Sequence, residues 1–269
     1  MNVKDKVIVV TGAGSGMGRA LALALVNRGA RIAAVDLNES SLKETAALTG
    51  QHQAQISRHT VNVSDHQAVE ALPGEVIAAH GVVDGIINNA GVIQPFVRLN
   101  DLPYDAIERV LNVNLYGVIY MTKAFLPHLL ERPTAHIVNV SSMGGFFPVP
   151  GQSLYGASKA GVKLLTEGLY SELLATNVRV TVVFPGAIAT NIAQNSGIAM
   201  PMGADSEAAQ SFPMTTADDA AEIIIKGMER DKFQVYVGND AKMMNWLYRL
   251  DPRRATQFMY NRMKELLPG

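Results

Sequence analysis

Short apolar runs recur along the chain and alternate with longer stretches of mixed polarity. Runs in which consecutive positions are apolar are typical of strands buried on both faces of a parallel sheet. The predicted strands cover residues 7–10, 31–37, 57–63, 85–91, 136–142, 179–186 and 233–238. Segments long enough for crossover helices lie between them, among them 19–29, 65–79, 104–130 and 158–176. This alternation predicts an α/β fold, a doubly wound sheet of seven parallel strands flanked by helices on both faces.

No internal repeat or linker divides the 269 residues, so we expect a single domain over 1–269. Residues 193–216 are rich in Gly, Met, Pro and Ser and are predicted to form a loop or lid at the substrate side. Residues 240–269 mix Met, Trp, Tyr and Arg and predict a helical extension. Such helices could close a pocket, pack on a subunit or rest on a membrane. We favour packing within the protein or an oligomer.

Composition narrows the function classes. The formal net charge is −1 and the basic residues are scattered, which argues against nucleic-acid binding. The absence of cysteine excludes disulfides, thiolate metal sites and a cysteine nucleophile, and it suits a reducing cytoplasm. No apolar run is long enough to span a bilayer, and the start of the chain shows no signal segment. The six histidines show no metal-ligand spacing, so we expect no metal.

A glycine loop, TGAGSGMG, occupies residues 11–18 directly behind the first predicted strand and opens a helix. In that setting a helix N-terminus offers unpaired N–H groups and the positive end of its dipole to a pyrophosphate. A side chain at Gly12, Gly16 or Gly18 would hold the phosphates off or disturb the turn. A Gly-rich strand–helix corner is the alternative interpretation.

Asp36 ends the second predicted strand, 18 residues beyond Gly18. A carboxylate there can accept hydrogen bonds from the adenosine ribose hydroxyls, and it would repel a 2′-phosphate. Leu37 and Asn38 bring no compensating positive charge, while Arg19 lies one residue into the helix and could be a solvated side chain. NAD is therefore predicted as the cofactor in preference to NADP.

A Tyr–Lys pair lies in YGASK, residues 155–159, where a helix is expected. Tyr155 and Lys159 are four residues apart and therefore share one helix face. A free phenol has a pKa of about 10. A nearby ammonium and a positive nicotinamide ring would lower that pKa, so that Tyr155 could exchange a proton with an alcohol while hydride leaves the carbinol carbon.

Two further polar residues accompany the pair. Ser142 ends the fifth predicted strand, at the carboxyl edge where doubly wound sheets bind ligands, and its hydroxyl could hold the substrate oxygen beside Tyr155. Asn114, in NVNLYG, lies inside a long predicted helix, where an amide is neutral to unfavourable. A polar task for Asn114 is therefore plausible.

These motifs resemble those of the short-chain dehydrogenase/reductase family. TGAGSGMG, NNAG (88–91), NVNLYG (112–117), the Ser142–Tyr155–Lys159 spacing and PGAIAT (185–190) follow the family's order. The resemblance is strong over residues 5–190 and implies a Rossmann-like fold. It also implies a dimer or tetramer, with a homotetramer as our expectation, often joined through the helices that contain Asn114 and Tyr155.

The resemblance implies specific roles. Tyr155 would be the acid/base, Ser142 would polarise the substrate oxygen, Lys159 would bind the nicotinamide ribose, and Asn114 would hold a water that links Lys159 to solvent. The implied cofactor-binding residues are Gly12, Ser15, Gly16, Met17, Gly18, Asp36, Leu37, Asn62, Val63, Asn89, Ala90, Gly91, Tyr155, Lys159, Pro185, Gly186, Ile188 and Thr190. Asn62 stands where the family often has Asp, and its amide can still reach the adenine amino group.

The expected substrate side is apolar. Residues 143–155 contain no Arg or Lys, so no clamp for a carboxylate or phosphate is evident. The predicted substrate-binding residues are Ser142, Gly144, Phe147, Val149 and Tyr155, with Phe146 and Pro150 beside them. The lid would add Ile198, Met200, Met202, Phe212 and Met214. We therefore expect a hydrophobic secondary alcohol or ketone: alicyclic, aromatic, steroid-like or long-chain.

Two other functions stay open at this point. One is an NADP-dependent ketoreductase of acyl-chain substrates, which a comparison of the two cofactors would separate. The other is a cofactor-binding regulatory protein that retains the fold without catalysis. The complete set of Asn114, Ser142, Tyr155 and Lys159 argues against the second alternative.

Overall fold

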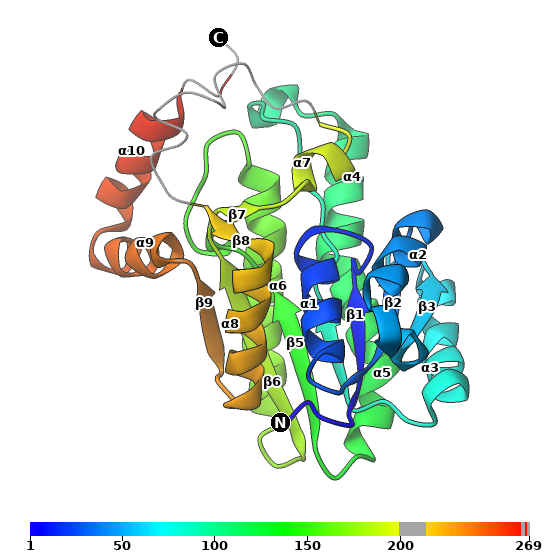
Figure 1. The fold of residues 1–269 in the computed structure, drawn as a ribbon. Coiled ribbons are helices and arrows are strands. Elements are labelled where there is room, and N and C mark those ends of the chain that lie inside the picture. The colour runs from blue at the N-terminus through cyan, green and yellow to red at the C-terminus, as the bar shows by residue number, and fades with distance from the viewer. Residues whose placement is uncertain (199–213, 265–266, 268–269) are drawn as a thin grey trace.

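The computed structural model describes residues 1–198, 214–264 and 267. Its main sheet has seven parallel strands in the spatial order β3-β2-β1-β4-β5-β6-β9 (Figure 1). The strands are β1 (Val7–Thr11), β2 (Arg31–Asp36), β3 (Ile56–Thr60), β4 (Gly85–Asn88), β5 (Ala135–Val140), β6 (Val178–Pro185) and β9 (Gln234–Val237). The predicted doubly wound fold is confirmed. The strand order reverses between β1 and β4, and ligands of such sheets bind beyond the carboxyl ends at this point.

Helices cover both faces of the sheet, which explains the unbroken apolar strands. One face carries α1 (Gly16–Val26), α2 (Glu39–Leu48) and α8 (Ala217–Glu229). The other carries α3 (His66–His80), α5 (Gly117–Leu130) and α6 (Ser153–Glu172). In Figure 1, α1 and α8 lie in front of the sheet, and α5 and α6 lie behind it.

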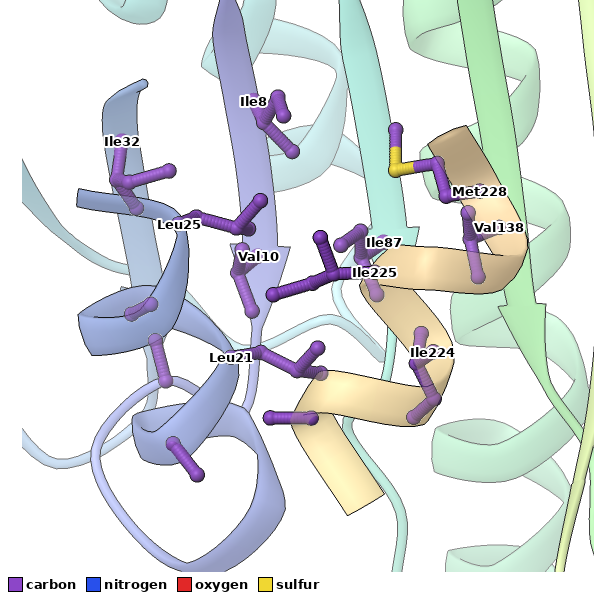
Figure 2. Close-up of a cluster of buried hydrophobic side chains, with 14 of the residues drawn as sticks. Ile8, Val10, Leu21, Leu25, Ile32, Ile87, Val138, Ile224, Ile225 and Met228 are labelled. Atoms are coloured by element: carbon purple, nitrogen blue, oxygen red, sulfur yellow. The ribbon is translucent and has the colours of Figure 1, made fainter. Parts of the chain in front are cut away.

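Each strand supplies alternate residues to two cores. Ile8 and Val10 of β1 pack with Leu21 and Leu25 of α1 and with Ile225 of α8 (Figure 2). The intervening residues of β1, Val7 and Val9, belong to the core beneath α3, α5 and α6. All four β1 residues have no exposed surface. A strand buried on both faces gives no alternation of polar and apolar residues, as the sequence pattern indicates.

One predicted helix is interrupted. The segment 104–130 forms α4 (Tyr104–Leu111), a π-helical turn η3 (Asn112–Tyr116) and α5. The chain also has three short 3-10 segments: η1 (Gly50–Gln55), η2 (Leu99–Asp101) and η4 (Met143–Gly145). Single π turns inside α-helices are rare and are frequent at functional sites. The turn at Asn112–Tyr116 places Asn114 in the protein interior.

The predicted lid is described only at its two ends. Its first part forms α7 (Ile192–Asn195), and β8 (Thr215–Thr216) pairs in parallel with β7 (Ile188–Ala189). Of the apolar residues expected there, Met200, Met202 and Phe212 lie outside the described residues. Ile198 is half-buried, and Met214 is exposed.

The C-terminal segment forms two helices, α9 (Asn239–Leu250) and α10 (Pro252–Met263), beyond the edge strand β9 (Figure 1). Met244, Ala255 and Met259 of these helices form a third apolar cluster with Phe147. Within the described part of the chain, no helix is both long and apolar enough to cross a membrane.

Candidate active site

The glycine loop joins β1 to α1 at the point where the strand order reverses. Gly12 and Gly16 have φ angles of 69° and 50°, which L side chains rarely adopt. A Cβ on Gly18 would overlap the Gly12 carbonyl oxygen. A Cβ on Gly16 would lie 3.3 Å from Thr190 of the loop after β6. The three glycines therefore hold a tight turn with bare backbone, where the N-terminus of α1 can receive a phosphate.

Asp36 lies beside this loop at the end of β2. Its Oδ2 accepts a hydrogen bond from the Gly14 N–H at 2.9 Å, and its Oδ1 accepts one from the Asn38 N–H at 3.0 Å. Arg19 is close by, since its guanidinium donates to the Gly14 carbonyl oxygen and forms a 2.9 Å ion pair with Glu44. Arg19, which shares Gly14 with Asp36, is therefore already paired with an acidic residue.

The NNAG segment packs directly against the glycine loop. Asn89 donates from Nδ2 to the Thr11 carbonyl oxygen at 2.9 Å, and the Thr11 hydroxyl accepts the N–H groups of Asn89 and Ala90. A Cβ on Gly91 would lie 3.3 Å from both Asn114 Oδ1 and Lys159 Nζ. Gly91 thus lies between the glycine loop and the polar centre of the site.

Of the two residues predicted to contact the adenine, Val63 is buried and Asn62 is exposed. Val63 is 8% exposed and packs in the core beside Gly117. Asn62 is exposed, and its Oδ1 accepts hydrogen bonds from the N–H and hydroxyl of Ser64. Leu37 is also exposed, at the rim beyond Asp36.

Ser142 and Tyr155 meet beyond the carboxyl end of β5. Ser142 follows the strand by two residues and caps η4, where its Oγ accepts the Gly144 N–H at 3.0 Å. Tyr155 lies in the first turn of α6, and its phenol faces the Ser142 side chain across Gly144. Gly144 lies against both, because a Cβ there would be 3.4 Å from Ser142 Oγ and from Tyr155 Cε1.

Burial raises the pKa of the Tyr155 phenol above its usual value, and the hydrogen bond with Ser142 acts weakly in the opposite direction. The sequence-based expectation of a lowered pKa assumed a nearby ammonium and a nicotinamide cation. In the protein alone the ammonium does not produce that effect, and desolvation dominates. Tyr155 is therefore protonated at neutral pH in this state.

Lys159 lies one turn after Tyr155 and is 3% exposed. Its Nζ donates to the Val140 carbonyl oxygen at 3.0 Å. Burial lowers the pKa of the ammonium to about 8, since the cation has little access to water. The lysine is thus a buried cation that readily loses its proton slightly above neutral pH.

Asn114 has no exposed surface, and its amide is bonded on both sides. Its Oδ1 accepts the Val92 N–H at 2.8 Å, while Nδ2 donates to the Val92 carbonyl oxygen at 2.9 Å and to Ser158 Oγ at 3.1 Å. The π turn places this amide between the segment after β4 and helix α6. Asn114 therefore joins the two segments that carry Gly91 and Lys159.

The loop after β6 closes the other side of the site, and Asp240 holds it in place. Asp240, at the start of α9, accepts the Ala187 N–H at 2.7 Å, and a Cβ on Gly186 would overlap its carboxylate. The sequence gives no signal for this residue, because a single acid at a helix start is common. Only the fold brings Asp240 to residues 185–190.

Gln94 is a second residue that sequence reasoning missed. It is fully buried, and its Oε1 accepts the N–H groups of Leu154 and Tyr155 at 2.9 and 3.0 Å. Its Nε2 donates to the Gly151 carbonyl oxygen, and Gln152 donates in turn to the Gln94 backbone. Helix α6 has no side-chain cap from Gln152, its own N-cap residue, so Gln94 supplies the acceptor from a distant loop.

The expected substrate wall is partly a core. Phe147 has no exposed surface and packs against Tyr248, with ring centroids 5.9 Å apart, and within the cluster of the C-terminal helices. Val149 and Gly144 are half-buried, and Phe146 packs edge-on against Phe184. The open part of this wall is therefore formed by its neighbours, and Phe147 supports it from behind.

No group of three His, Cys, Asp or Glu residues that could hold a metal ion occurs in the described ranges. The histidines have other environments. His136 is buried on β5 against Thr181, and His59 and His80 share Ser57.

Comparison with known proteins shows to which family the chain belongs. The family model described as short chain dehydrogenase matches residues 6–200. The chain belongs to the short-chain dehydrogenase/reductase family. It is therefore an oxidoreductase with the nucleotide-binding fold of these enzymes, as the motifs predict.

Relatives of this short-chain dehydrogenase/reductase match most of its length. It is 38% identical to the SadH protein of Mycobacterium tuberculosis over 255 residues, which cover 91% of this chain and 90% of that protein. It is 31% identical to 1-deoxy-11-beta-hydroxypentalenate dehydrogenase of Streptomyces exfoliatus, with 90% and 86% covered. A crystal structure of a family member from Burkholderia phymatum in complex with NAD aligns with a TM-score of 0.85, at 27% identity, over 94% and 96% of the two chains.

Proposed function

We propose that this enzyme transfers a hydride between NAD(H) and a hydrophobic secondary alcohol or ketone. The observation that carries the proposal is the group formed by Ser142, Tyr155 and Lys159 beyond the carboxyl end of β5. The Ser142 hydroxyl and the Tyr155 phenol face each other, and the buried Lys159 ammonium lies one helical turn after Tyr155. Such a group can hold a carbonyl or carbinol oxygen and exchange one proton with it.

The glycine loop offers bare backbone to a dinucleotide at the start of α1. Gly12, Gly16 and Gly18 leave backbone N–H groups accessible at the start of α1, and Gly91 leaves room beside Lys159. Residues 185–190 form the opposite wall, with Ile188 and Thr190 as the candidates for contact with the nicotinamide carboxamide. When bound, the nicotinamide supplies the hydride acceptor or donor.

In this proposal the protein binds the substrate oxygen and exchanges one proton with it. Ser142 holds and polarises the substrate oxygen, and Tyr155 takes the hydroxyl proton during oxidation or gives it back during reduction. Lys159 contributes positive charge beneath the site, and a bound nicotinamide cation would add to it. Both charges favour the phenolate and thereby offset the effect of burial on the Tyr155 pKa. Asn114 holds the Val92 backbone and the Ser158 hydroxyl next to Lys159, where it could also hold a water that links Lys159 to solvent.

Asp36 supports NAD in preference to NADP. A 2′-phosphate on the adenosine ribose would meet this carboxylate, and Arg19 is already paired with Glu44. Like charges at close range cost several kcal/mol. Two solved relatives are described with NAD bound, the enzyme from Burkholderia phymatum and a xylitol dehydrogenase.

The substrate class follows from charge and polarity. Residues 143–155 contain neither Lys nor Arg, and Val149 and Ile198, from the segments expected to line the substrate, are half-buried apolar side chains. Alicyclic, aromatic, steroid-like or long-chain alcohols suit such a wall. The related enzyme of Streptomyces exfoliatus is named as a dehydrogenase of 1-deoxy-11-beta-hydroxypentalenate.

We also propose a homo-oligomer, a dimer or tetramer, that is joined through α5 and α6. Leu164 on α6 is 69% exposed and Leu174 just after it is 59% exposed. Tyr170 on α6 and Tyr116, directly before α5, add partly exposed aromatic surface. Sedimentation of the wild type and of Leu164→Glu measures this directly, and a monomeric wild type contradicts it.

The decisive test replaces Tyr155 by Phe. We expect kcat for a cyclic secondary alcohol to fall by about 10²–10⁴-fold, because the proton exchange is lost. NAD binding, followed by fluorescence titration, stays within a few-fold of the wild type. Tyr104→Phe is the matched control, since that tyrosine is 85% exposed and lies away from the site. Turnover retained in Tyr155→Phe would contradict the assignment, and a wild type inactive across cyclic, aromatic and steroidal alcohols would favour a regulatory role.

A further inference from the structure

Helix α9 has one apolar stripe that nothing in the described chain covers. Met243, Trp246 and Leu250 are 47%, 64% and 63% exposed. Their spacing of three and four residues places them on one face of the helix. The opposite face is buried, because Met244 is 1% exposed and packs with Phe147 in the third apolar cluster.

Positive charge lies beside this stripe. Residues 239–264 contain six basic and two acidic residues, whereas the whole chain has a net charge of −1. Lys242 and Arg249 are exposed along one side of the stripe on α9, and Arg253 is exposed in the first turn of α10. One of the two acids, Asp240, is 8% exposed and bonded to the loop after β6, so it does little to balance these cations at the surface.

The position of α9 and α10 in the molecule leaves this surface accessible. Helices α9 and α10 project from the body at the edge of the molecule beyond β9 (Figure 1). A stripe of Met, Trp and Leu with Lys and Arg beside it, on a helix that is too short and too polar to span a bilayer, is typical of helices that lie in the membrane interface.

We propose that α9 and α10 form a docking surface for an anionic lipid bilayer. The cations contact the headgroups while Met243, Trp246 and Leu250 enter the boundary with the acyl chains. A second copy of this chain fits less well. A two-fold contact through this surface would bring Lys242, Arg249 and Arg253 close to the same three cations of the other copy.

This proposal does not depend on the reaction, but it has a consequence for the site. The same helix that presents the stripe packs on Phe147 behind the substrate wall and bonds Ala187 of the loop after β6 through Asp240. Docking would therefore bring the substrate side of the enzyme next to the bilayer.

Trp246 is the only tryptophan, so its fluorescence reports on this surface directly. We would titrate the full-length protein with vesicles of phosphatidylcholine and with vesicles of an equal mixture of phosphatidylcholine and phosphatidylglycerol. The expected result is a blue shift of Trp246 emission and co-sedimentation with the anionic vesicles only, weakened by added salt. No binding to either vesicle, or equal binding to both, overturns the proposal.

Three variants refine the test and keep the reporter. Lys242→Gln/Arg253→Gln removes two cations and should weaken binding about 30-fold, since each basic residue near an anionic surface contributes about 1 kcal/mol. Met243→Ser/Leu250→Ser should also reduce binding. Leu48→Ser/Leu99→Ser, which changes two residues that are each 60% exposed elsewhere, should bind like the wild type. A blue shift that rises with protein concentration without lipid would overturn the proposal in favour of a contact between two copies.

Discussion

Gly18 is a residue whose role is set by space alone. A Cβ there would overlap the Gly12 carbonyl oxygen, and the amide of Asn89 would lie against it as well. The sequence motif predicts a glycine at this position for phosphate approach. The structure adds that the turn from β1 into α1 also packs against the segment after β4 here. Phosphate approach and this packing both require a residue without a side chain at position 18.

We predict that Gly18→Ala lowers the free energy of unfolding by about 1–3 kcal/mol, because overpacking a tight contact displaces backbone. It should also weaken NAD binding. Gly74→Ala is the control, since Gly74 lies inside α3 with no heavy atom within 4 Å of its added Cβ. That substitution should stabilise the protein by about 0.5–1 kcal/mol. Urea unfolding measures both, and equal effects of the two substitutions would contradict the argument.

Asp36 is a second single residue with a predicted role, the preference for NAD over NADP. Asp36→Asn removes the negative charge and keeps one acceptor for the neighbouring backbone N–H groups. We expect the ratio of kcat/KM for NAD to that for NADP to fall by about 10-fold to 100-fold. Asp218→Asn, an exposed acid on α8, should leave the ratio unchanged. A wild type that prefers NADP would support the acyl-chain ketoreductase instead.

At the scale of elements, strands are far easier to predict than the interruptions of helices. The central strands were predictable because burial on both faces leaves an apolar signal at every position of a strand such as β1, whereas the edge strands β3 and β9 are only partly buried. The segment 104–130 was predicted to be one helix, because the residues on both sides of the π turn are helical and no Gly or Pro lies within the turn. In the sequence, the only sign of the π turn is Asn114, an amide inside a predicted helix. In the structure this amide bonds Val92 and Ser158.

Gln94 could not be predicted from the sequence for a related reason. It lies 60 residues before Leu154, and no local pattern links a glutamine in a loop to the start of a helix. The order of the motifs fixes which residues meet at the site. The acceptors that fix their orientation come from tertiary packing.

We predict that Gln94→Ala lowers both stability and kcat. It leaves the N–H groups of Leu154 and Tyr155 without an acceptor, at a cost of about 1–3 kcal/mol. Gln94→Glu should restore only part of the loss, because a carboxylate accepts the same two bonds but places a second oxygen against the Gly151 carbonyl oxygen. Gln67→Ala, at an exposed position, is the control. Thermal unfolding and kcat are measured together, and a harmless Gln94→Ala would contradict the role.

At the scale of the whole molecule, His136 links the sheet to the dependence of stability on pH. It lies fully buried on β5, with its Nε2 bonded to Thr181, and faces Asp231, Arg179 and the N-terminal ammonium. Burial is the main cause that lowers the pKa of His136 to about 3, and the N-terminal ammonium acts in the same direction. The neutral form is thus required in the fold.

The sign of the effect follows from proton binding. Between pH 6.5 and about 3 the unfolded chain binds a proton at His136 and the folded chain does not, so stability falls as the pH falls. We expect a loss of about 2 kcal/mol from this residue between pH 7 and pH 5. In His136→Gln the difference between urea unfolding at these two pH values should shrink by about that amount. His66→Gln, at an exposed position, should not change it.

The contact between Asn195 and Ser15 has a thermodynamic consequence. Asn195 Nδ2 donates to Ser15 Oγ at 2.8 Å, so helix α7, at the start of the substrate-side segment, is fastened to the loop that would receive the pyrophosphate. A molecule that displaces either partner changes the state of the other. We therefore expect the two ligands of the enzyme to be coupled. Linkage makes such coupling reciprocal: an alcohol that tightens dinucleotide binding tenfold itself binds tenfold more tightly to the dinucleotide complex.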